Sequence, residues 1–475
     1  MKRAVRMGMA LLCVGASAYA ETVRAEEPTS TWASAQLSLD DVVMSAEQAY
    51  PLLRAAELEN KIAVADMKSA EGSFDLSWRT RGTITPVGYY ESVRVESVVE
   101  KPTAIWGSSV FAGYKLGTGK FAVYDGGRQT LEYGEVRAGV NVPLVRNGPT
   151  DRRRASLERA ELGLDIAKLS VTEQRIQVRR SAAHRYWNWV AAGQRLRLAE
   201  ELLRIVEGRD AGLATRVERG DLPRFERTDN ARAVEQRKAQ IALSRRGIEQ
   251  AAIELGLFLR DEKGDPAPPA LDRMPRNFPQ VTQDEPDDAA AIGTALAERP
   301  ENRRLQLQWS QQHVERRYAR NQLWPALDLQ LAGSQDIGRE MVGRPDLSKP
   351  VFEASLLLDV PLQTRVMDGR AEAAEVSMRR LVEQQRFMTD RIRADVRDAL
   401  SGVRRARERI DATRKEVALA EELEAAERTR FEQGDSHLLI VNLREQQTAE
   451  ARLREVDALL DYFRSKADLR AAQGK

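Results

Sequence analysis

Cysteine and histidine are scarce in this chain, and their scarcity excludes several kinds of site. Among its 475 residues there is one cysteine, Cys13, and there are three histidines, His184, His313 and His437. A single cysteine cannot form an internal disulfide, and Leu12 stands before it where a lipoprotein signal would carry a small residue. The histidines lie far apart and lack the spacing of metal ligands. The sequence therefore predicts no disulfide, no lipid-anchored cysteine, no metal site and no cofactor.

Long apolar runs are also missing, apart from one near the amino end. Residues 1–20 combine a basic start, an apolar stretch from Met7 to Ala18 and the ending Ala18-Tyr19-Ala20, a pattern typical of a cleaved secretion signal. After this segment no run reaches the roughly 18 apolar residues that a membrane-spanning helix needs. The mature chain is expected outside the cytoplasm, and any membrane-spanning part would have to consist of strands.

An excess of either charge is missing as well. The chain has 74 Lys and Arg against 72 Asp and Glu, and the two signs are interleaved along nearly every predicted helix. We interpret basic stretches such as DRRRAS, residues 151–156, as solvated helix faces with paired charges rather than as a surface for nucleic acid. A coiled coil that binds nucleic acid is a distant alternative, and secretion weakens it further.

No catalytic motif stands out. The stretch GYKLGTGKF superficially suggests a phosphate-binding loop, but glycine is absent six positions before Lys120, and Phe121 occupies the place of the Ser or Thr that would hold magnesium. Tyr186, Trp187 and Trp189 share one predicted helix and are interpreted as packing aromatics rather than as a ligand-binding group. Acidic and basic residues are plentiful everywhere, so no catalytic pair can be nominated. We do not expect an enzyme.

The sequence instead contains two repeats with the same order of helices and strands. A Pro- and Asp-rich connector without periodicity, residues 261–288, separates a first repeat at residues 37–260 from a second at residues 289–472. Each repeat is predicted to hold a first helical segment, two strands, a very long helix, a glycine turn and a return helix. Pro51 and Pro300 interrupt the first helical segments where a second short helix would begin with proline.

Strict alternation of apolar and polar residues predicts four strands, two in each repeat. A soluble sandwich would show the same pattern, but the intervening helices are too long to pack over so few strands. Several chains could instead close one barrel with lipid outside and water inside. The alternating apolar positions are Phe74, Leu76 and Trp78; Val136, Ala138, Val140 and Val142; Leu327, Leu329 and Leu331; and Phe352, Ala354, Leu356, Leu358 and Val360.

One segment between the predicted strands has no assignment. Residues 79–135 are far longer than their counterpart at residues 332–351. They include alternating apolar residues at Val110, Ala112 and Tyr114, which fit either an extra hairpin or a surface loop.

Two stretches are predicted to form very long helices. From about residue 152 to 216, and again from about 368 to 431, only isolated glycines interrupt good helix formers, so each helix is expected to reach roughly 95 Å. Apolar residues recur every seven positions along both, which is the packing pattern of a coiled coil. These positions include Leu157, Leu164, Val171 and Val178 in the first helix and Val396, Val403, Ile410 and Val417 in the second.

Both long helices end in the same short motif. Gly220 with Asp221, in RVERGDL, and Gly434 with Asp435, in RFEQGDS, stand at equal places. Glycine is preferred just past a helix end, and Asp or Ser often caps the next helix. A tight helix–turn–helix is therefore predicted at each tip, with the two aspartates as caps of the return helices.

With its parts in this order, the sequence resembles the TolC family of outer-membrane efflux proteins across essentially the whole mature chain. The matching stretches are AYPLLRAA and ERPENRRL, NVPLVRNG and DVPLQTRVMDGRAEAA, and the two glycine tips. The resemblance implies a homotrimer in which each chain gives four strands to a twelve-stranded membrane β-barrel and its long hairpins to a periplasmic α-helical tunnel. It also implies that the tips, with Gly220, Asp221, Gly434 and Asp435, dock on a periplasmic adaptor that leads to an inner-membrane pump.

The place where such a tunnel would narrow departs from the family pattern. The resemblance implies acidic residues at the positions of Ile440 and Leu443, which are apolar here. We therefore hypothesise an apolar constriction formed by Leu439, Ile440 and Leu443, which would close by poor wetting. Ordinary packing of these residues between hairpins is an equally weighted alternative.

The sequence as a whole predicts a mainly α protein with a membrane β-barrel, acting as a passive exit duct in the outer membrane of a Gram-negative-type bacterium. Its energy would come from a partner pump. The alternative is a secreted periplasmic coiled-coil scaffold or adaptor that does not span the membrane. The paired strands in each repeat favour the duct. Whether the cargo is a drug, a metal ion or a secreted protein, as in type I secretion, does not follow from the residues.

Overall fold

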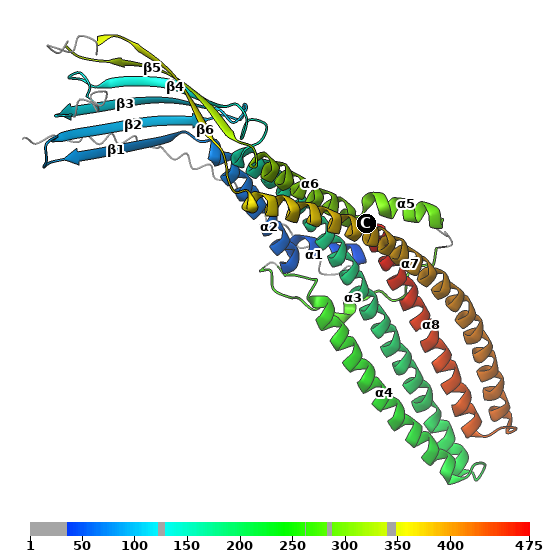
Figure 1. The fold of residues 1–475 in the computed structure, drawn as a ribbon. Coiled ribbons are helices and arrows are strands. Elements are labelled where there is room, and N and C mark those ends of the chain that lie inside the picture. Colours follow the sequence, from blue (N-terminus) through cyan, green and yellow to red (C-terminus); the bar gives the residue numbers. More distant parts are fainter. Residues whose placement is uncertain (1–35, 122–128, 262, 283–286, 340–347) are drawn as a thin grey trace, which may run out of the picture.

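The chain forms an elongated molecule with a sheet at one end and a long layer of helices at the other (Figure 1). This computed structural model describes residues 36–121, 129–261, 263–282, 287–339 and 348–475. The predicted secretion signal at residues 1–20, with Cys13, lies outside the described residues. The two helical hairpins end at the tips far from the sheet.

Each repeat opens with two short helices that meet at a proline, as the sequence predicts. Pro51 and Pro300 stand at the first position of α2 and α6, where the missing N–H costs no helical hydrogen bond. Ser38 and Asp41 cap α1 reciprocally, since the backbone N–H of each donates to the side chain of the other at 2.9 and 3.2 Å. The bounds are Leu39–Ala49 for α1, Pro51–Glu71 for α2, Asp288–Glu298 for α5 and Pro300–Asn321 for α6.

The long helices confirm the predicted rods. α3 has 67 residues and α7 has 69, so each is about 100 Å long. Asp151 caps α3 by accepting hydrogen bonds from the backbone N–H groups of Arg153 and Arg154 at 2.7 and 3.0 Å. In the described part of the chain, no helix combines the length and the apolar character needed to cross a membrane. The bounds are Arg152–Glu218 for α3, Arg224–Gly256 for α4, Arg365–Gln433 for α7 and Leu438–Ala472 for α8.

The strands form one antiparallel sheet in the order β1-β2-β3-β4-β5-β6. The prediction of four strands per chain was wrong, because residues 79–135 contribute β2 and β3 as an extra hairpin. A twelve-stranded ring therefore no longer follows from three copies. The bounds are Ser77–Thr85 for β1, Ser92–Pro102 for β2, Ser109–Gly119 for β3, Glu135–Pro143 for β4, Ala326–Asp336 for β5 and Val351–Asp359 for β6.

The first strand also begins later than predicted. Phe74 belongs to a short 3-10 turn that continues from the end of α2, and Leu76 precedes β1. The backbone N–H of Asp75 donates to the carbonyl of Gly72 at 3.1 Å, which closes this turn. The alternation of Phe74, Leu76 and Trp78 thus spans a helix end and a strand start.

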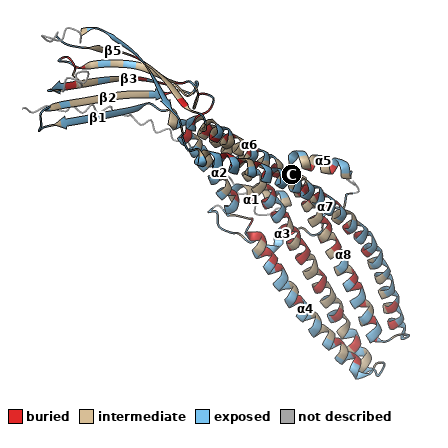
Figure 2. Cartoon of the chain, in the orientation of Figure 1, coloured by how far each residue is buried: buried red, intermediate tan, exposed pale blue. Residues whose placement is uncertain are grey.

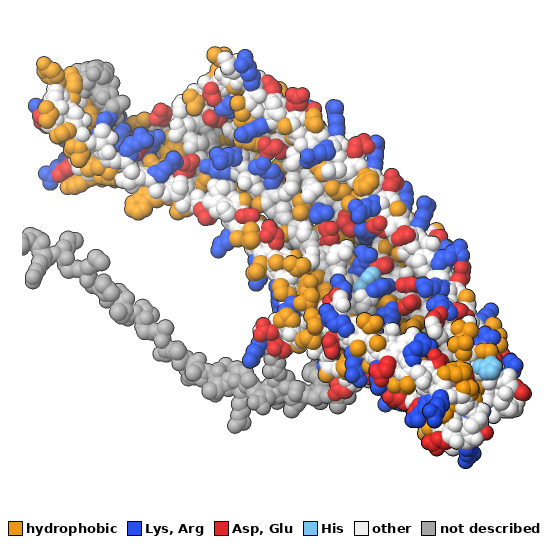
Figure 3. Space-filling model, turned by 90° about the horizontal axis from the view of Figure 1, so that it is seen from below, with side chains coloured by type: hydrophobic (Ala, Val, Ile, Leu, Met, Phe, Trp, Pro, Cys, Tyr) orange, Lys and Arg blue, Asp and Glu red, His pale blue; other side chains and the backbone are white. Residues whose placement is uncertain are grey.

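Strand register places apolar side chains on one face of the whole sheet. Trp78 lies opposite Val99, Val99 opposite Ala112, and Ala112 opposite Ala138. Side chains alternate between faces along a strand, so this ladder defines a single surface. Figure 3 shows orange side chains gathered at the sheet end. The surface further includes Val93, Val95, Val110, Tyr114, Val136, Val140, Leu329, Leu331, Phe352, Leu356 and Leu358.

The opposite face of the sheet is mainly polar, with Val98, Phe111 and Leu357 among its apolar exceptions, and it carries ion pairs. Lys115 on β3 contacts Glu135 on β4 at 3.1 Å, and Arg79 on β1 contacts Glu100 on β2. Asn141 on β4 donates to Ser109 on β3 at 3.2 Å. The sheet therefore has one face suited to an apolar medium and one suited to water.

The helices form a layer that is four helices wide along its length. Near the sheet α2, α3, α6 and α7 pack side by side in this order, whereas toward the tips the order is α4, α3, α8 and α7. Buried residues run along these helices as stripes, while the strands are mostly intermediate or exposed (Figure 2). The heptad positions lie on these stripes: Val178, Val396 and Ile410 are buried, and Val403 packs against the core.

The main core lies midway along the layer, where the predicted aromatic residues pack. The ring of Trp187 stacks on Phe463 with centroids 4.3 Å apart, and Trp189 is fully buried. The hydroxyl of Tyr186 donates to the carbonyl of Leu37 at 3.0 Å. Burial, with Asp41 and Asp40 nearby, raises the pKa of Tyr186 to about 12. These aromatics fill the core, as the sequence predicts.

Gly139 on β4 offers a test of the sheet register. It lies opposite Phe111, and a Cβ at this position would stand 2.2 Å from the carbonyl oxygen of Leu331 and 2.7 Å from the Phe111 ring. We expect Gly139→Ala to push β4 away from β5 and to lower the unfolding free energy by roughly 2 kcal/mol, measured by thermal unfolding. Gly333→Ala, where a Cβ meets nothing within 4 Å, is the matched control. Equal thermal unfolding midpoints for Gly139→Ala and Gly333→Ala would contradict this register.

Candidate functional site at the hairpin tips and the sheet junction

The second hairpin turns through a left-handed glycine. Gly434 has a φ of 87°, a conformation that glycine adopts without the strain of a side chain. Its N–H donates to the carbonyl of Phe431 at 3.2 Å, and the N–H of Asp435 donates to the carbonyl of Arg430 at 2.9 Å. These two bonds satisfy carbonyls at the end of α7 in the Schellman pattern.

The first hairpin repeats this turn bond for bond. Gly220 has a φ of 82°, and its N–H donates to the carbonyl of Val217 at 3.1 Å. The N–H of Asp221 donates to the carbonyl of Arg216 at 2.9 Å. The equal spacing of the two glycine motifs thus corresponds to equal backbone geometry.

The two aspartates do not cap the return helices, so that prediction was wrong. α4 begins after Pro223 and α8 begins after His437, and neither start has a side-chain capping bond. Each left-handed turn is followed by further residues before the chain becomes helical again. Asp221 and Asp435 therefore close the preceding helix through their backbone N–H groups.

A buried polar network joins the two hairpins one to three turns behind the tips. Glu445 on α8 is 2% exposed, and its Oε1 accepts hydrogen bonds from Arg209 on α3 and, at 3.1 Å, from Arg428 on α7. Arg209 also donates to the side-chain oxygen of Asn442 at 2.8 Å, and Asn442 donates to Asp229 on α4 at 3.2 Å. All four long helices thus share one network, in which two guanidinium groups compensate a buried carboxylate.

Sequence reasoning missed this network because Arg and Glu occur on nearly every helical turn. One signal was present in α8. Leu438, Val441, Glu445 and Thr448 are all buried and follow the three-and-four spacing of a packed helix face. A glutamate on such a face requires a buried cation, and α3 and α7 supply it.

The proposed constriction residues lie on the other side of α8. Leu438 and Val441 pack in a small core with Leu213 and Phe431. Leu439, Ile440 and Leu443 face away from this core and are 66%, 38% and 51% exposed. Within one chain, therefore, packing between the two hairpins does not cover them.

A second polar assembly fixes the sheet to the helices. The side chain of Arg154 donates to the carboxylate of Asp151 at 2.8 Å and to the carbonyls of Asn147 and Gly148 at 2.6 and 2.8 Å. Asn147 itself has a φ of 68°, unusual for a residue with a side chain. The loop that leads from β4 into α3 is thereby held in one conformation.

The β2–β3 turn packs against the same loop. Trp106 in this turn has a φ of 52°, and its indole lies so close to Gly148 that a Cβ there would stand 2.7 Å from the ring. Asn321, at the end of α6, accepts a hydrogen bond from the backbone N–H of Asn147 at 2.9 Å. Two strands, one loop and two helices therefore meet in a single joint.

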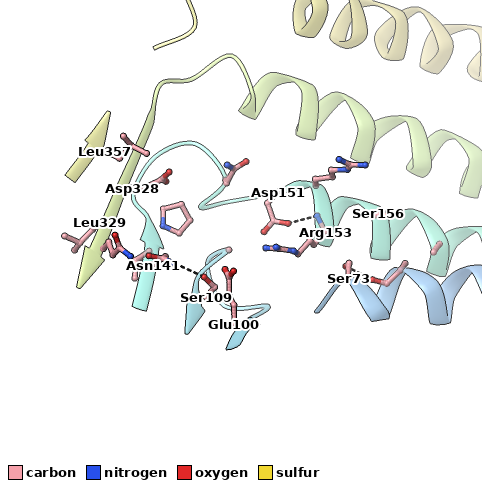
Figure 4. A pocket seen from close by; sticks show the side chains of 18 of the residues that line it. Ser73, Glu100, Ser109, Asn141, Asp151, Arg153, Ser156, Asp328, Leu329 and Leu357 are labelled. Atoms are coloured by element: carbon pink, nitrogen blue, oxygen red, sulfur yellow. Dashed lines mark hydrogen bonds between the residues drawn. The ribbon is translucent and has the colours of Figure 1, made fainter. Parts of the chain in front are cut away.

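Beside this joint the sheet, the end of α2 and the start of α3 border an open cavity of about 1000 Å³ (Figure 4). Charged and polar side chains line it, among them Glu100, Asp151, Arg153 and Asp328. Within the described ranges, no group of three or more His, Cys, Asp or Glu residues is placed to hold a metal ion. Apolar residues such as Val142, Leu329 and Leu357 line it as well.

No protein-family model and no curated protein matches the sequence. Solved structures match over nearly all of the described chain. The outer-membrane channel OprN is similar with a TM-score of 0.67, 14% identity and coverage of 92% of this chain and 89% of that one. The MtrE outer-membrane channel of Neisseria gonorrhoeae has a TM-score of 0.65, 18% identity and coverage of 93% and 89%. The outer-membrane protein VceC of Vibrio cholerae has a TM-score of 0.66, 15% identity and coverage of 92% and 96%.

At these identities the likeness concerns the fold. The sheet joined to long helical hairpins is the fold of outer-membrane channels, which the TolC resemblance led us to expect. The structure brings the two glycine tips to the same end of the molecule, and it exposes the three apolar residues near the second tip.

Replacing the buried glutamate tests the network behind the tips. Glu445→Gln leaves Arg209 and Arg428 without their carboxylate, so we expect the unfolding free energy to fall by about 3 kcal/mol, measured by urea unfolding. Glu421→Gln is the matched control, because its partner Arg452 holds it in a pair in which the carboxylate is 45% exposed. The control should change by less than about 0.5 kcal/mol. A similar small change for both variants would contradict the buried network.

Proposed function

We propose that this chain is a passive exit duct of the outer membrane, with its sheet in the lipid bilayer and its helices in the periplasm. The observation that carries the proposal is the sheet, whose six strands share one apolar face and continue into rods of about 100 Å. The fold shared with outer-membrane channels supports it. The secretion signal predicted at residues 1–20 agrees with it.

A homotrimer is part of the proposal. One sheet of six strands has two open edges and cannot enclose water by itself. Three copies would join these edges in one barrel and the helical layers in one tunnel. The polar sheet face and the cavity beside Asp151 would then line the lumen, which suits hydrophilic or amphiphilic cargo.

The tips are proposed to dock on a periplasmic adaptor that leads to an inner-membrane pump. Gly220, Asp221, Gly434 and Asp435 are exposed at the outermost turns of the hairpins. The chain is proposed to act without enzymatic activity. Its partner pump would supply the driving force and select the cargo.

Leu439, Ile440 and Leu443 are proposed to form the constriction at the tunnel entrance. Their exposure in one chain leaves them free to face a lumen, and an apolar ring would resist wetting by ions.

Ile440→Asp tests this constriction. Because a carboxylate from each chain would wet the ring and attract cations, we expect single-channel conductance in planar bilayers to rise at least about twofold, with stronger cation selectivity. Leu243→Asp on α4, at a residue 68% exposed and distant from the tip, should leave both properties unchanged. Unaltered conductance in Ile440→Asp would place the residue away from the pore.

Membrane fractionation with a mass measurement tests the function itself. We expect the protein in the outer-membrane fraction and a detergent-corrected mass of three chains. A soluble monomer or dimer in the periplasm would overturn the duct and favour the secreted scaffold.

A further inference from the structure

The β2–β3 hairpin has no helix of its own. β1 continues from α2, β4 leads into α3, β5 continues from α6, and β6 leads into α7. β2 and β3 instead have only other strands before and after them in the chain. The four strands expected from the sequence are the four that adjoin helices, so the hairpin is an addition to the wall of the sheet.

The β2–β3 hairpin is part of the continuous sheet and does not pack over its face. β2 pairs along its whole length with β3, and β1 pairs along its whole length with β2. Its apolar side chains, including Val95, Val99 and Val110, share the apolar face of the sheet, while Arg94 and Glu96 share the polar face. An appended hairpin would have no reason to match both faces of its neighbours.

The width of the sheet agrees with this position. Strands spaced about 4.8 Å apart and tilted by about 40° occupy roughly 6 Å each around a barrel, so six strands cover about 37 Å and four cover about 25 Å. The four helices that adjoin the sheet, packed about 10 Å apart, cover about 40 Å. With the hairpin in the wall, the sheet is about as wide as the helical layer beneath it.

The outer edges of this widened sheet are suited to a second copy of the chain. In the described sheet β1 and β6 each pair on one side only. Arg81 on β1 and Glu353 on β6 project from the polar face, are exposed, and have no ion-pair partner among the described residues. Opposite charges at the two edges, together with an apolar face on both strands, favour pairing of β6 with β1 of the next copy.

We propose that three copies close a ring of eighteen strands, which makes the outer mouth about as wide as the helical tunnel. The inference rests on the proposed trimeric duct and specifies the size of its cargo. Eighteen strands give a backbone diameter of about 36 Å, against about 24 Å for twelve. With side chains about 5 Å deep on the inner wall, the ring admits solutes up to roughly 25 Å across instead of roughly 14 Å. The sheet end then passes bulky solutes such as short polymers.

The experiment compares the full-length trimer with a variant that lacks the hairpin. In this variant a short Gly-Ser linker replaces residues 86–134, so that β1 turns directly into β4. Electron microscopy of the detergent-solubilised protein, viewed end-on, measures the diameter of the sheet ring. In planar bilayers, poly(ethylene glycol) of graded size is added on the side of the sheet, and exclusion is read from the channel current.

We expect an end-on ring of about 36 Å in the wild type, with entry of polymers about 20 Å across, and a ring of about 24 Å that excludes them in the variant. A wild-type trimer with the narrower ring would overturn the eighteen-stranded wall while leaving the duct intact. Absence of a membrane-bound trimer would overturn the proposed function and this inference with it. If the variant does not fold, the ring diameter of the wild type and the largest polymer that enters it still decide between eighteen and twelve strands.

Discussion

Unpaired backbone groups at the two edges of the sheet are the constraint on which the rest of this structure depends. β1 and β6 each leave one edge open in the described sheet, and such edges cost several kcal/mol per unsatisfied group in lipid. An apolar face suits the sheet to a membrane, but the same face and edges make one chain incomplete there. In the proposed trimer, association with further copies would resolve both problems. The helices must then run together from the sheet, since their upper ends are fixed to neighbouring strands.

The helical layer meets this requirement with two kinds of contact. Heptad positions such as Val178 and Val396 give continuous packing without setting its axial position, because apolar side chains tolerate sliding. The contacts of Arg209 and Arg428 with Glu445 fix the axial position of the helices. A shift of one helical turn would leave a buried carboxylate without its cations. The network therefore fixes how the two hairpins align near their free ends.

The sequence predicted the parts whose signal is local. Pro51 and Pro300 mark helix starts by their chemistry, and the rods follow from long stretches of helix formers with a repeating apolar position. β2 escaped prediction because Val98 and Val99 interrupt its alternation, and β3 could not be placed because its neighbours are defined only by pairing across the chain. Asp221 and Asp435 were misassigned because the same residue types occur just after a helix and just before one. The sequence could not predict which charged residues meet at Glu445, because the docking of one hairpin on the other decides this.

The joint around Arg154 has a mechanical consequence. Its bonds to Asp151, Asn147 and Gly148 clamp the upper end of α3 to the sheet, so the long helices behave as beams held at one end. A sideways displacement of about 5 Å at the free end of a beam about 100 Å long needs only about 3° of bending, which lies within the ordinary curvature of long helices. Movement at the tips thus requires no hinge, and the sheet can stay still while the tips are displaced.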